Sequence, residues 1–214
     1  DYSGLNLDSY NFVGFYNYKQ IFTEGLNGLA SMVIWTILFA LSVVSISFVF
    51  GSWLATILNK LDARASKVYR VIYILPWVIP TVITLLMWQG LLSEGGLINS
   101  MLNLIGIRSL PFLSNPIWAR FSTVIVMVWF SFPYYMIVAM GFIQSISNDC
   151  YEAACIDGAS KAKVFFRITL PMIFNAMLPT LVMGFIMQFN QFGVYMLTGG
   201  GPASGKLGDP GTTD

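Results

Sequence analysis

Charged side chains are scarce in this chain, and histidine is absent. Only 10% of the 214 residues are Asp, Glu, Lys or Arg, whereas 56% are hydrophobic, a composition far from that of soluble globular proteins. Without histidine the chain lacks the commonest metal ligand and the usual proton shuttle of enzymes. We therefore expect no metal site and no cofactor. The net charge of +1 gives no reason to expect nucleic acid as a partner.

Cysteine is also rare. The two cysteines, Cys150 and Cys155, are five positions apart and do not form a CxxC motif. No histidine accompanies them as a catalytic base. They are predicted to be free thiols without a catalytic role, as is usual for cysteines that face a reducing cytoplasm.

Long runs without any charge predict membrane spans. Residues 25–59, 71–93 and 121–148 contain no charged side chain, and the chain is apolar again after Arg167. About 20 apolar residues in a helix cross the hydrocarbon core of a bilayer. The predicted fold class is therefore an all-α membrane protein, a polytopic helical bundle. Its four transmembrane helices are expected at about 28–58, 71–93, 121–147 and 168–197.

The basic residues predict the orientation of these helices. Seven of the eleven Lys and Arg lie in two short loops, 60–70 and 149–167. By the positive-inside rule both loops are expected in the cytoplasm. An amphipathic segment, 1–27, and a terminal loop, 198–214, would then flank the transmembrane domain 28–197 on the external side.

The external loop 94–120 has a helical pattern of its own. Leu97, Met101 and Leu104 recur at helical spacing and predict a short interfacial helix. Asn115 and Pro116 predict a turn before the third span.

The longest polar interruption between two spans is Tyr151–Pro171. It is predicted to form two short helices, the first capped by Asp149 with Glu152 and the second by Ser160. Gly158 supplies the permissive backbone between them. The second helix is expected to run into apolar sequence until Pro171.

The same stretch carries a long gapped motif. Glu152-Ala153-Ala154, Gly158, Ile168 and Leu170-Pro171 fit EAA-x3-G-x9-I-x-LP and resemble the EAA loop of importer permeases of the ATP-binding cassette (ABC) class. The resemblance implies a cytoplasmic coupling loop, 149–171, that docks on an ATPase subunit. The alternative is an ordinary basic loop with helical ends. The residues that the resemblance assigns to coupling are Glu152, Ala153, Ala154, Asp157, Gly158 and Ala159.

Two further segments carry the resemblance to sugar permeases. Residues 11–22 are similar to the "FVG–x–x–NY" segment that follows the first membrane helix of that class, so a helix is expected before residue 1. Residues 197–202 read LTGGGP, which resembles the sugar-permease signature, and residues 208–214 are similar to the larger type of maltose/maltodextrin permease subunit.

One apparent nucleotide motif is rejected. Residues 200–206 match GxxxxGK, but Leu207 stands where a P-loop needs Ser or Thr, and no strand precedes the glycines.

The family resemblance implies the partners. They are a second permease subunit, an ATPase dimer, an external substrate-binding protein, the sugar and membrane lipid. Rival readings are a secondary transporter or channel, an intramembrane enzyme, and a purely structural subunit. The four spans lack Asp, Glu, Lys, Arg and His, so they offer no group to couple a proton gradient and no base for catalysis.

The family resemblance also predicts which residues bind the sugar. A saccharide needs amides for its hydroxyls and aromatic rings for its C–H faces. Aligned by Pro76, Pro133 and Pro171, the resemblance places the cavity positions on Trp77, Thr81, Phe130, Tyr134, Gly184, Gln188 and Gln191. Residues 184, 188 and 191 would share one helix face. Gly184 replaces a small hydroxyl and Gln188 a shorter amide of that pattern. The alternative is that these residues only pack helices together.

Overall fold

A computed structural model describes residues 14–15, 18–19, 22–23, 26–191 and 193–198. All regular elements in this part of the chain are helical. Most of the predicted amphipathic segment, the glycines after Thr198, the GxxxxGK match and the terminal loop lie outside the described residues. The helices are α2 (Leu26–Leu58), α3 (Ala63–Val78), α4 (Thr81–Leu92), α5 (Leu97–Leu104), α6 (Pro116–Ile143), α7 (Asn148–Ile156), α8 (Lys161–Val164), the π-helical turn η1 (Phe165–Thr169), α9 (Leu170–Phe189) and α10 (Val194–Thr198).

Four stretches are long and apolar enough to cross a membrane, the number that the sequence predicts, although the second stretch includes the short helix predicted for the external loop 94–120. They are Ala30–Leu58, Thr81–Leu104, Pro116–Ile143 and Lys161–Phe189. The helix α2 alone has 33 residues and is about 50 Å long at 1.5 Å per residue, well beyond the ~30 Å hydrocarbon core.

The predicted second span, 71–93, is not one helix. α3 ends at Val78, Ile79 is extended (φ −71°, ψ 133°), and α4 begins only at Thr81. Pro80 explains the break, because it lacks an N–H for the helical ladder and disfavours helical backbone at the residue before it. Pro76, in contrast, lies inside α3.

The last predicted span, 168–197, also has different bounds. α8 continues through η1 into α9, so the helix does not stop at Pro171. In η1 the Leu170 N–H bonds to the Phe165 carbonyl, five residues earlier. Such a π-turn relaxes the ladder where Pro171 lacks a donor. At the other end, α9 stops at Phe189 and α10 is separate.

The structure adds one helix cap where only a turn was predicted, confirms a second cap and corrects a third. Asn115 accepts from the N–H groups of Ile117 and Trp118 at the start of α6, five residues before the predicted start. Ser160 accepts from Lys163 N–H. Ser147, not Asp149, caps α7 by accepting from the Asp149 N–H at 3.2 Å; Asp149 is already inside the helix, where its carboxylate favours the N-terminal dipole.

The core is built on the crossing of α2 and α6. Small residues recur on α2 every fourth position at Ser47, Gly51 and Ala55, all of them buried. A Cβ built on Gly51 would lie only 2.8 Å from Met136 N and 2.9 Å from Phe132 O. Small residues at such a crossing let two membrane helices approach closely.

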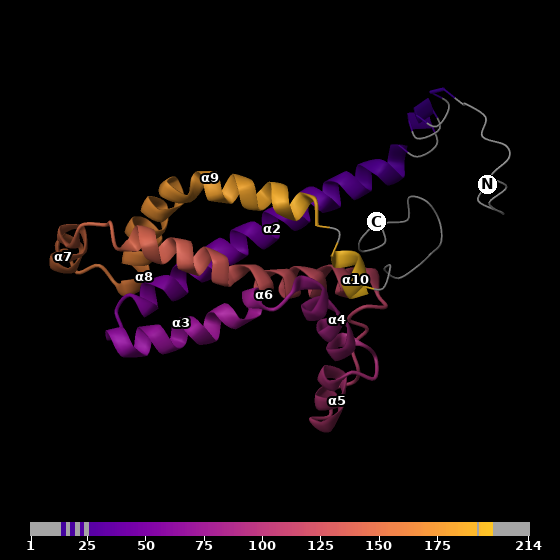
Figure 1. The fold of residues 1–214 in the computed structure, drawn as a ribbon, viewed down its shortest axis with the longest axis horizontal. Helices are drawn as coiled ribbons and strands as arrows, with labels where there is room; N and C mark the ends of the chain where they lie inside the picture. The colour runs from indigo at the N-terminus through magenta and orange to yellow at the C-terminus, as the bar shows by residue number, and fades with distance from the viewer. Residues whose placement is uncertain (1–13, 16–17, 20–21, 24–25, 192, 199–214) are drawn as a thin grey trace.

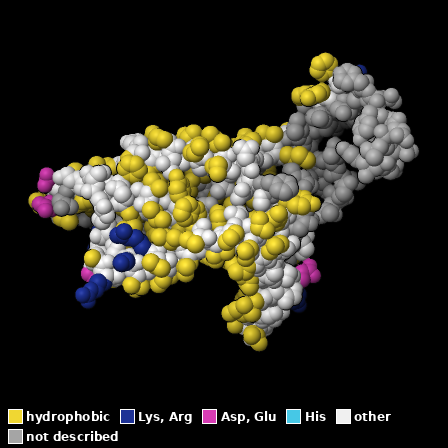
Figure 2. All heavy atoms as spheres, in the orientation of Figure 1, with side chains coloured by type: hydrophobic (Ala, Val, Ile, Leu, Met, Phe, Trp, Pro, Cys, Tyr) yellow, Lys and Arg dark blue, Asp and Glu magenta, His cyan; other side chains and the backbone are white. Residues whose placement is uncertain are grey.

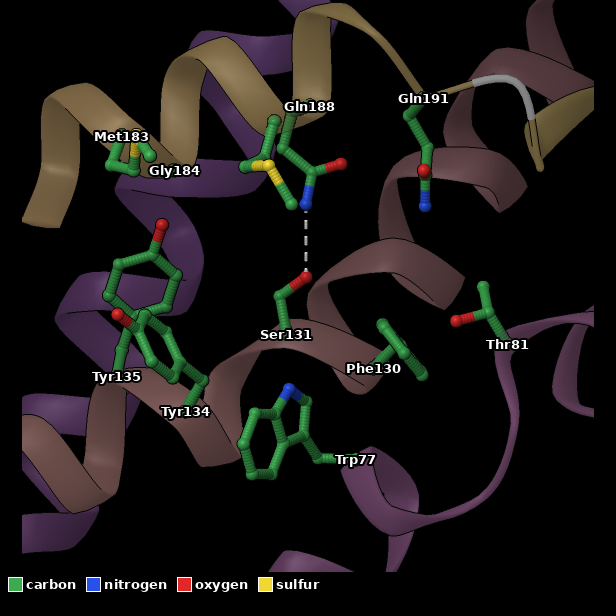
Figure 3. Close-up of a pocket in the computed structure, with 11 residues that line it drawn as sticks. Trp77, Thr81, Phe130, Ser131, Tyr134, Tyr135, Met183, Gly184, Gln188 and Gln191 are labelled. Carbon is green, nitrogen blue, oxygen red and sulfur yellow. Dashed lines mark hydrogen bonds between the residues drawn. The ribbon is translucent and has the colours of Figure 1, made fainter.

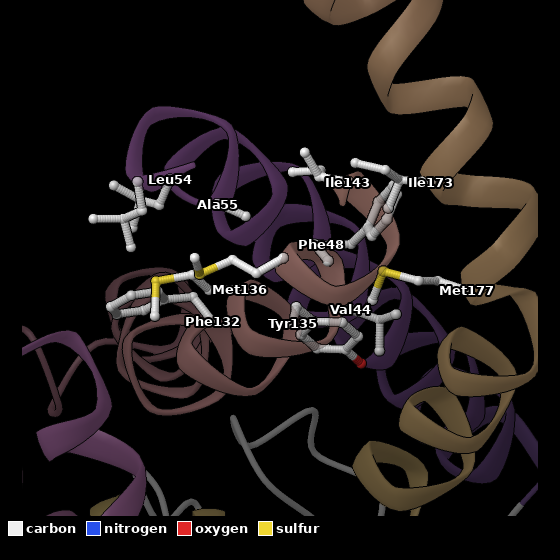
Figure 4. Packing of buried hydrophobic residues seen from close by; sticks show 13 residues of the cluster. Val44, Phe48, Leu54, Ala55, Phe132, Tyr135, Met136, Ile143, Ile173 and Met177 are labelled. Atoms are coloured by element: carbon white, nitrogen blue, oxygen red, sulfur yellow. The ribbon is translucent and has the colours of Figure 1, made fainter. Parts of the chain in front are cut away.

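α9 covers one side of this crossing. Figure 4 shows Ile173 and Met177 facing Phe48 and Val44 of α2. A second buried cluster joins α2, α4, α6 and α10, with Leu85, Met127 and Leu197 almost fully enclosed. The short helix α10 is therefore part of the packed bundle.

The two ends of the bundle differ. α7, α8 and the start of α3 lie together at one end, whereas α4, α5 and α10 lie toward the other (Figure 1). Lys and Arg side chains gather at the α3–α8 end (Figure 2). The two basic loops thus share one end of the molecule, as expected if both are on the same side of a membrane.

Candidate functional site

One cavity of about 430 Å³ brings together all seven residues predicted for the sugar. It lies between the α3–α4 break, the middle of α6, and the end of α9 (Figure 3). The lining residues are Trp77, Thr81, Phe130, Ser131, Tyr134, Tyr135, Met183, Gly184, Met187, Gln188 and Gln191.

The α3–α4 break supplies the first wall. Trp77 precedes the extended Ile79, and Thr81 is the first residue of α4. Non-helical backbone at membrane depth is tolerated where it is buried in protein or lines a cavity. The break therefore has the location expected of a binding site.

α6 supplies an aromatic wall. Phe130 and Tyr134 are one helical turn apart, with Pro133 between them. The Tyr134 ring lies 5.9 Å from the Trp77 ring at an interplanar angle of 32°, and 5.5 Å from the Tyr135 ring at 73°. The rings of Trp77 and Tyr134 offer broad apolar surfaces beside polar groups, the combination that sugar rings require.

The backbone of α9 at Gly184 lies directly against the Tyr135 side chain. A Cβ built on Gly184 would collide with Tyr135 Oη, so any larger residue at 184 must displace that ring or the helix. Tyr135 is itself 3% exposed and has no room to move without repacking. The small hydroxyl residue expected at this position is thus incompatible with the observed position of Tyr135.

Gln188 contributes a polar amide group to the lining of the cavity. Its Nε2 donates a hydrogen bond of 3.1 Å to Ser131 Oγ on α6 (Figure 3). Its Oε1 is buried and has no hydrogen-bond partner among the described residues. A buried acceptor without a partner costs free energy unless a ligand or water supplies a donor.

Gln191 lines the cavity for a reason other than the one predicted. α9 ends at Phe189 with Asn190 as its cap, so 184, 188 and 191 do not share one helix face. Gln191 instead follows the helix, in the turn to α10. Gly193 holds this turn close to α4, since a Cβ there would lie 2.9 Å from Leu85 Cδ1.

Four lining residues were not predicted: Ser131, Tyr135, Met183 and Met187. Each immediately precedes or follows a predicted residue on the same helix, at the same four-residue spacing. The pairs 131/135 and 183/187 could have been found by widening the predicted stripes by one position. All eleven lining residues are uncharged at neutral pH, and no metal-binding cluster occurs among the described residues.

The predicted coupling residues lie on α7 and directly after it, at the basic end of the bundle. Gly158 has φ +68°, a left-handed conformation that only glycine adopts readily. Glu152, Ala153, Asp157 and Gly158 are exposed. Ala154 is buried and Ala159 half-buried, so these two support the loop from inside.

α7 is anchored to the transmembrane bundle by one hydrogen bond. Thr169 Oγ1, at the end of η1, donates to Tyr151 Oη at 3.3 Å. Ile156, at the free end of α7, is 86% exposed. Glu152 and Asp157, on the same helix and at its end, are exposed as well.

Comparison with known proteins agrees with this arrangement. Residues 47–212 match the family described as binding-protein-dependent transport system inner membrane component. The chain belongs to this family. The resemblance based on the EAA-like motif is thereby confirmed at the level of the family.

Several curated relatives are sugar permeases. The galactooligosaccharides transport system permease protein GanP of Bacillus subtilis is 37% identical over 90% of this chain and 47% of its own length. The maltodextrin permease MalC of Streptococcus pneumoniae is 34% identical over 95% and 49%. The maltose/maltodextrin permease MalF of Escherichia coli K12 is 37% identical over 88% and 38%. The chain thus spans about half the length of these relatives, or less.

The fold is that of solved ABC importers. A bacterial ABC transporter involved in the import of the acidic polysaccharide alginate superposes with a TM-score of 0.68 at 26% identity, over 87% of this chain and 69% of that chain. The same kind of transporter in complex with an alginate pentasaccharide-bound periplasmic protein gives a TM-score of 0.63 at 27% identity.

Proposed function

We propose that this chain forms half of the translocation path of an ATP-driven, binding-protein-dependent importer of an uncharged oligosaccharide of the maltodextrin type. The observation that carries the proposal is the 430 Å³ cavity at the helix break, lined by aromatic rings and amides. Its partners would be a second permease subunit, an ATPase dimer and an external substrate-binding protein.

The cavity favours a neutral substrate over an acidic one. The relatives are named for galactooligosaccharides and maltodextrin, whereas the solved transporter imports acidic alginate. Basic side chains would be expected around a polyuronate, because a carboxylate is held best by charged donors. The lining has none, but it has indole, phenol, hydroxyl and amide groups suited to sugar hydroxyls and C–H faces.

Coupling to ATP would pass through α7. In this proposal the exposed face of α7 docks on the ATPase in the cytoplasm, and movement of α7 reaches α9 through the Tyr151–Thr169 contact. Gln188 lies 19 residues further along the same helical rod, about 28 Å away at 1.5 Å per residue. A tilt of that rod would change the cavity wall at Gly184 and Gln188.

A secondary transporter or channel remains the rival function. It would need no ATPase, and its transport would continue without ATP. Membership of a binding-protein-dependent family favours the ATP-driven importer.

The test is uptake of labelled sugars by the complete complex in proteoliposomes. Gln188→Leu is expected to raise the KM for maltotriose about three- to tenfold, the value of one hydrogen bond. Tyr134→Ala is expected to lower uptake about tenfold through lost ring contact. Basal ATP hydrolysis and complex assembly should stay near the wild-type level.

Two matched variants serve as controls. Asn175→Leu removes an exposed amide of α9 that does not line the cavity, and Phe121→Ala removes an exposed α6 ring. Both should transport normally. Uptake that is unchanged in Gln188→Leu and Tyr134→Ala for every neutral oligosaccharide tested would refute the substrate site; uptake that persists without ATP would refute the importer.

A further inference from the structure

An apolar groove runs along the outer side of α2 and ends at two lysines. Its basic end, about 420 Å³, is lined by Trp53, Thr56, Ile57, Lys60, Leu61, Lys161, Ala162, Phe165 and Phe166. A second stretch, about 450 Å³, shares Trp53, Phe165 and Phe166 and continues over Ser45, Ile46, Val49 and Phe50. Because they share three residues, the two stretches form one continuous groove, called here the α2–η1 groove.

The charge in the groove is confined to one end. Lys60 follows the end of α2, and Lys161 is the first residue of α8; both are exposed. No acidic residue is among those that line either stretch, all of which are described residues. The two ammonium groups therefore present positive charge at one end of the groove. Lys and Arg side chains in general gather at this end of the bundle (Figure 2).

The apolar part is long enough for a lipid tail, because a third apolar stretch shares Ser45 and Val49 with the second and extends the groove to Leu41. Ser45 and Trp53 are eight residues apart on α2, about 12 Å at 1.5 Å per residue. One leaflet of the hydrocarbon core is about 15 Å deep, half of ~30 Å. Phe50 and Trp53 stack with ring centroids 5.8 Å apart and are 40% and 46% exposed, so they offer a flat wall for an acyl chain.

The geometry points to a binding site for one anionic phospholipid, with its phosphate at Lys60 and Lys161 and an acyl chain along Phe50 and Trp53. Basic pockets between membrane helices on one face of the bilayer take anionic headgroups by this combination. A sugar does not fit, because the second stretch offers almost no polar surface. The site is separate from the sugar cavity, with which it shares no residue.

The groove is linked to coupling because two of its lining residues belong to the π-turn η1. Phe165 and Phe166 begin η1, the turn whose last residue, Thr169, holds α7 through Tyr151. An occupied groove would brace this turn against α2. We therefore expect bound lipid to support the sugar-stimulated ATPase activity of the complex, in addition to being retained through purification.

The experiment uses the full-length permease in its assembled complex, in nanodiscs of phosphatidylcholine with phosphatidylglycerol. Native mass spectrometry counts the lipid that stays bound. Lys60→Gln and Lys161→Gln are each expected to weaken phosphatidylglycerol retention about fivefold, as one basic side chain near an anionic headgroup would. Lys163→Gln, two residues from Lys161 with the same charge and exposure but outside the groove, should have no effect.

Two further variants separate lipid from a protein occupant. Ala162→Phe fills the groove without altering charge and should also expel the lipid. A photoreactive benzoylphenylalanine in place of Phe166 should cross-link to phospholipid. Retention unchanged in the Lys60→Gln/Lys161→Gln double variant, equal retention of phosphatidylcholine, or a cross-link to another polypeptide segment would each overturn the assignment.

Discussion

Gln188 on α9 and Ser131 on α6 are joined by a 3.1 Å hydrogen bond across the wall of the cavity. The bond uses the amide N–H and leaves the amide oxygen facing a site without a partner among the described residues. Ser131 thereby holds the Gln188 side chain in its observed position. Because the amide oxygen is buried in this position, a sugar hydroxyl reaches it only after the side chain or a neighbouring residue moves.

Ser131→Ala should weaken sugar binding without touching the sugar-facing amide itself. Losing the hydrogen bond frees Gln188 to rotate, which is expected to raise the KM for maltotriose about threefold to tenfold. Ser131→Thr keeps the hydroxyl and should transport like the wild type. Uptake kinetics in proteoliposomes make the measurement. A normal KM in Ser131→Ala would mean that Ser131 does not position the amide.

Gly184 and Tyr135 should behave as a coupled pair. Gly184→Ser places a Cβ where Tyr135 Oη lies, and overpacking of this kind typically costs about 1–3 kcal/mol of stability. Tyr135→Phe removes the colliding oxygen, so the double variant should recover most of the lost thermal stability and uptake. A double-mutant cycle measures the coupling. Additive losses in the two single variants would contradict the pairing.

Local structure could be predicted from the sequence where a single residue type determines the backbone conformation or the end of a helix. Gly158 at the left-handed break, Ser160 at the start of α8 and Asn115 before α6 were all predicted and are confirmed. The four spans were predictable because charge-free runs of this length have few other solutions in a chain so apolar. The cap of α7 was wrong because Ser147 and Asp149 are both good caps, and only the fold decides between them.

The sequence did not predict which prolines interrupt a helix. Pro76 and Pro133 lie inside helices, whereas Pro80 ends one, yet all three lie in long runs without any charge. In membranes a proline is compatible with either outcome, since neighbouring helices can satisfy the freed carbonyl. The family resemblance, and not the helix pattern, therefore identified the cavity residues. Gln191 does line the cavity, but it does not continue the helix face of Gly184 and Gln188 as predicted, because α9 ends at Phe189.

Gly51 should be intolerant of any side chain. Gly51→Ala brings a Cβ within 2.8–2.9 Å of α6 backbone atoms, which cannot rotate away as a side chain could. We expect a loss of about 1–3 kcal/mol and a lower melting temperature in detergent. Gly90→Ala on α4 meets nothing within 4 Å and should be neutral or stabilising. Equal melting temperatures for the two variants would contradict the close α2–α6 crossing.

Coupling should depend on the shape and charge of α7 and its turn. Gly158→Pro imposes a negative φ where the backbone has +68°, and Glu152→Lys reverses an exposed charge. Both are expected to abolish most sugar-stimulated ATP hydrolysis and to weaken pull-down of the ATPase. Membrane insertion should remain normal. Glu94→Lys, at the opposite end of the bundle, is the charge control. Full sugar-stimulated ATP hydrolysis in both Gly158→Pro and Glu152→Lys would contradict the proposed role of α7 in coupling.

The native thiols provide a test of orientation. Cys150 and Cys155 are free and exposed on α7, so a membrane-impermeant maleimide reaches them only from the side on which α7 lies. We expect labelling in inside-out vesicles and none in intact cells or right-side-out vesicles. In a Cys150→Ser/Cys155→Ser background, Ser109→Cys in the loop after α5 should show the reverse pattern. Labelling should also slow when the ATPase is bound, because α7 would then be covered. Labelling of α7 from outside the cell would contradict the proposed topology. It would also contradict the assignment of α7 as the surface that contacts the ATPase.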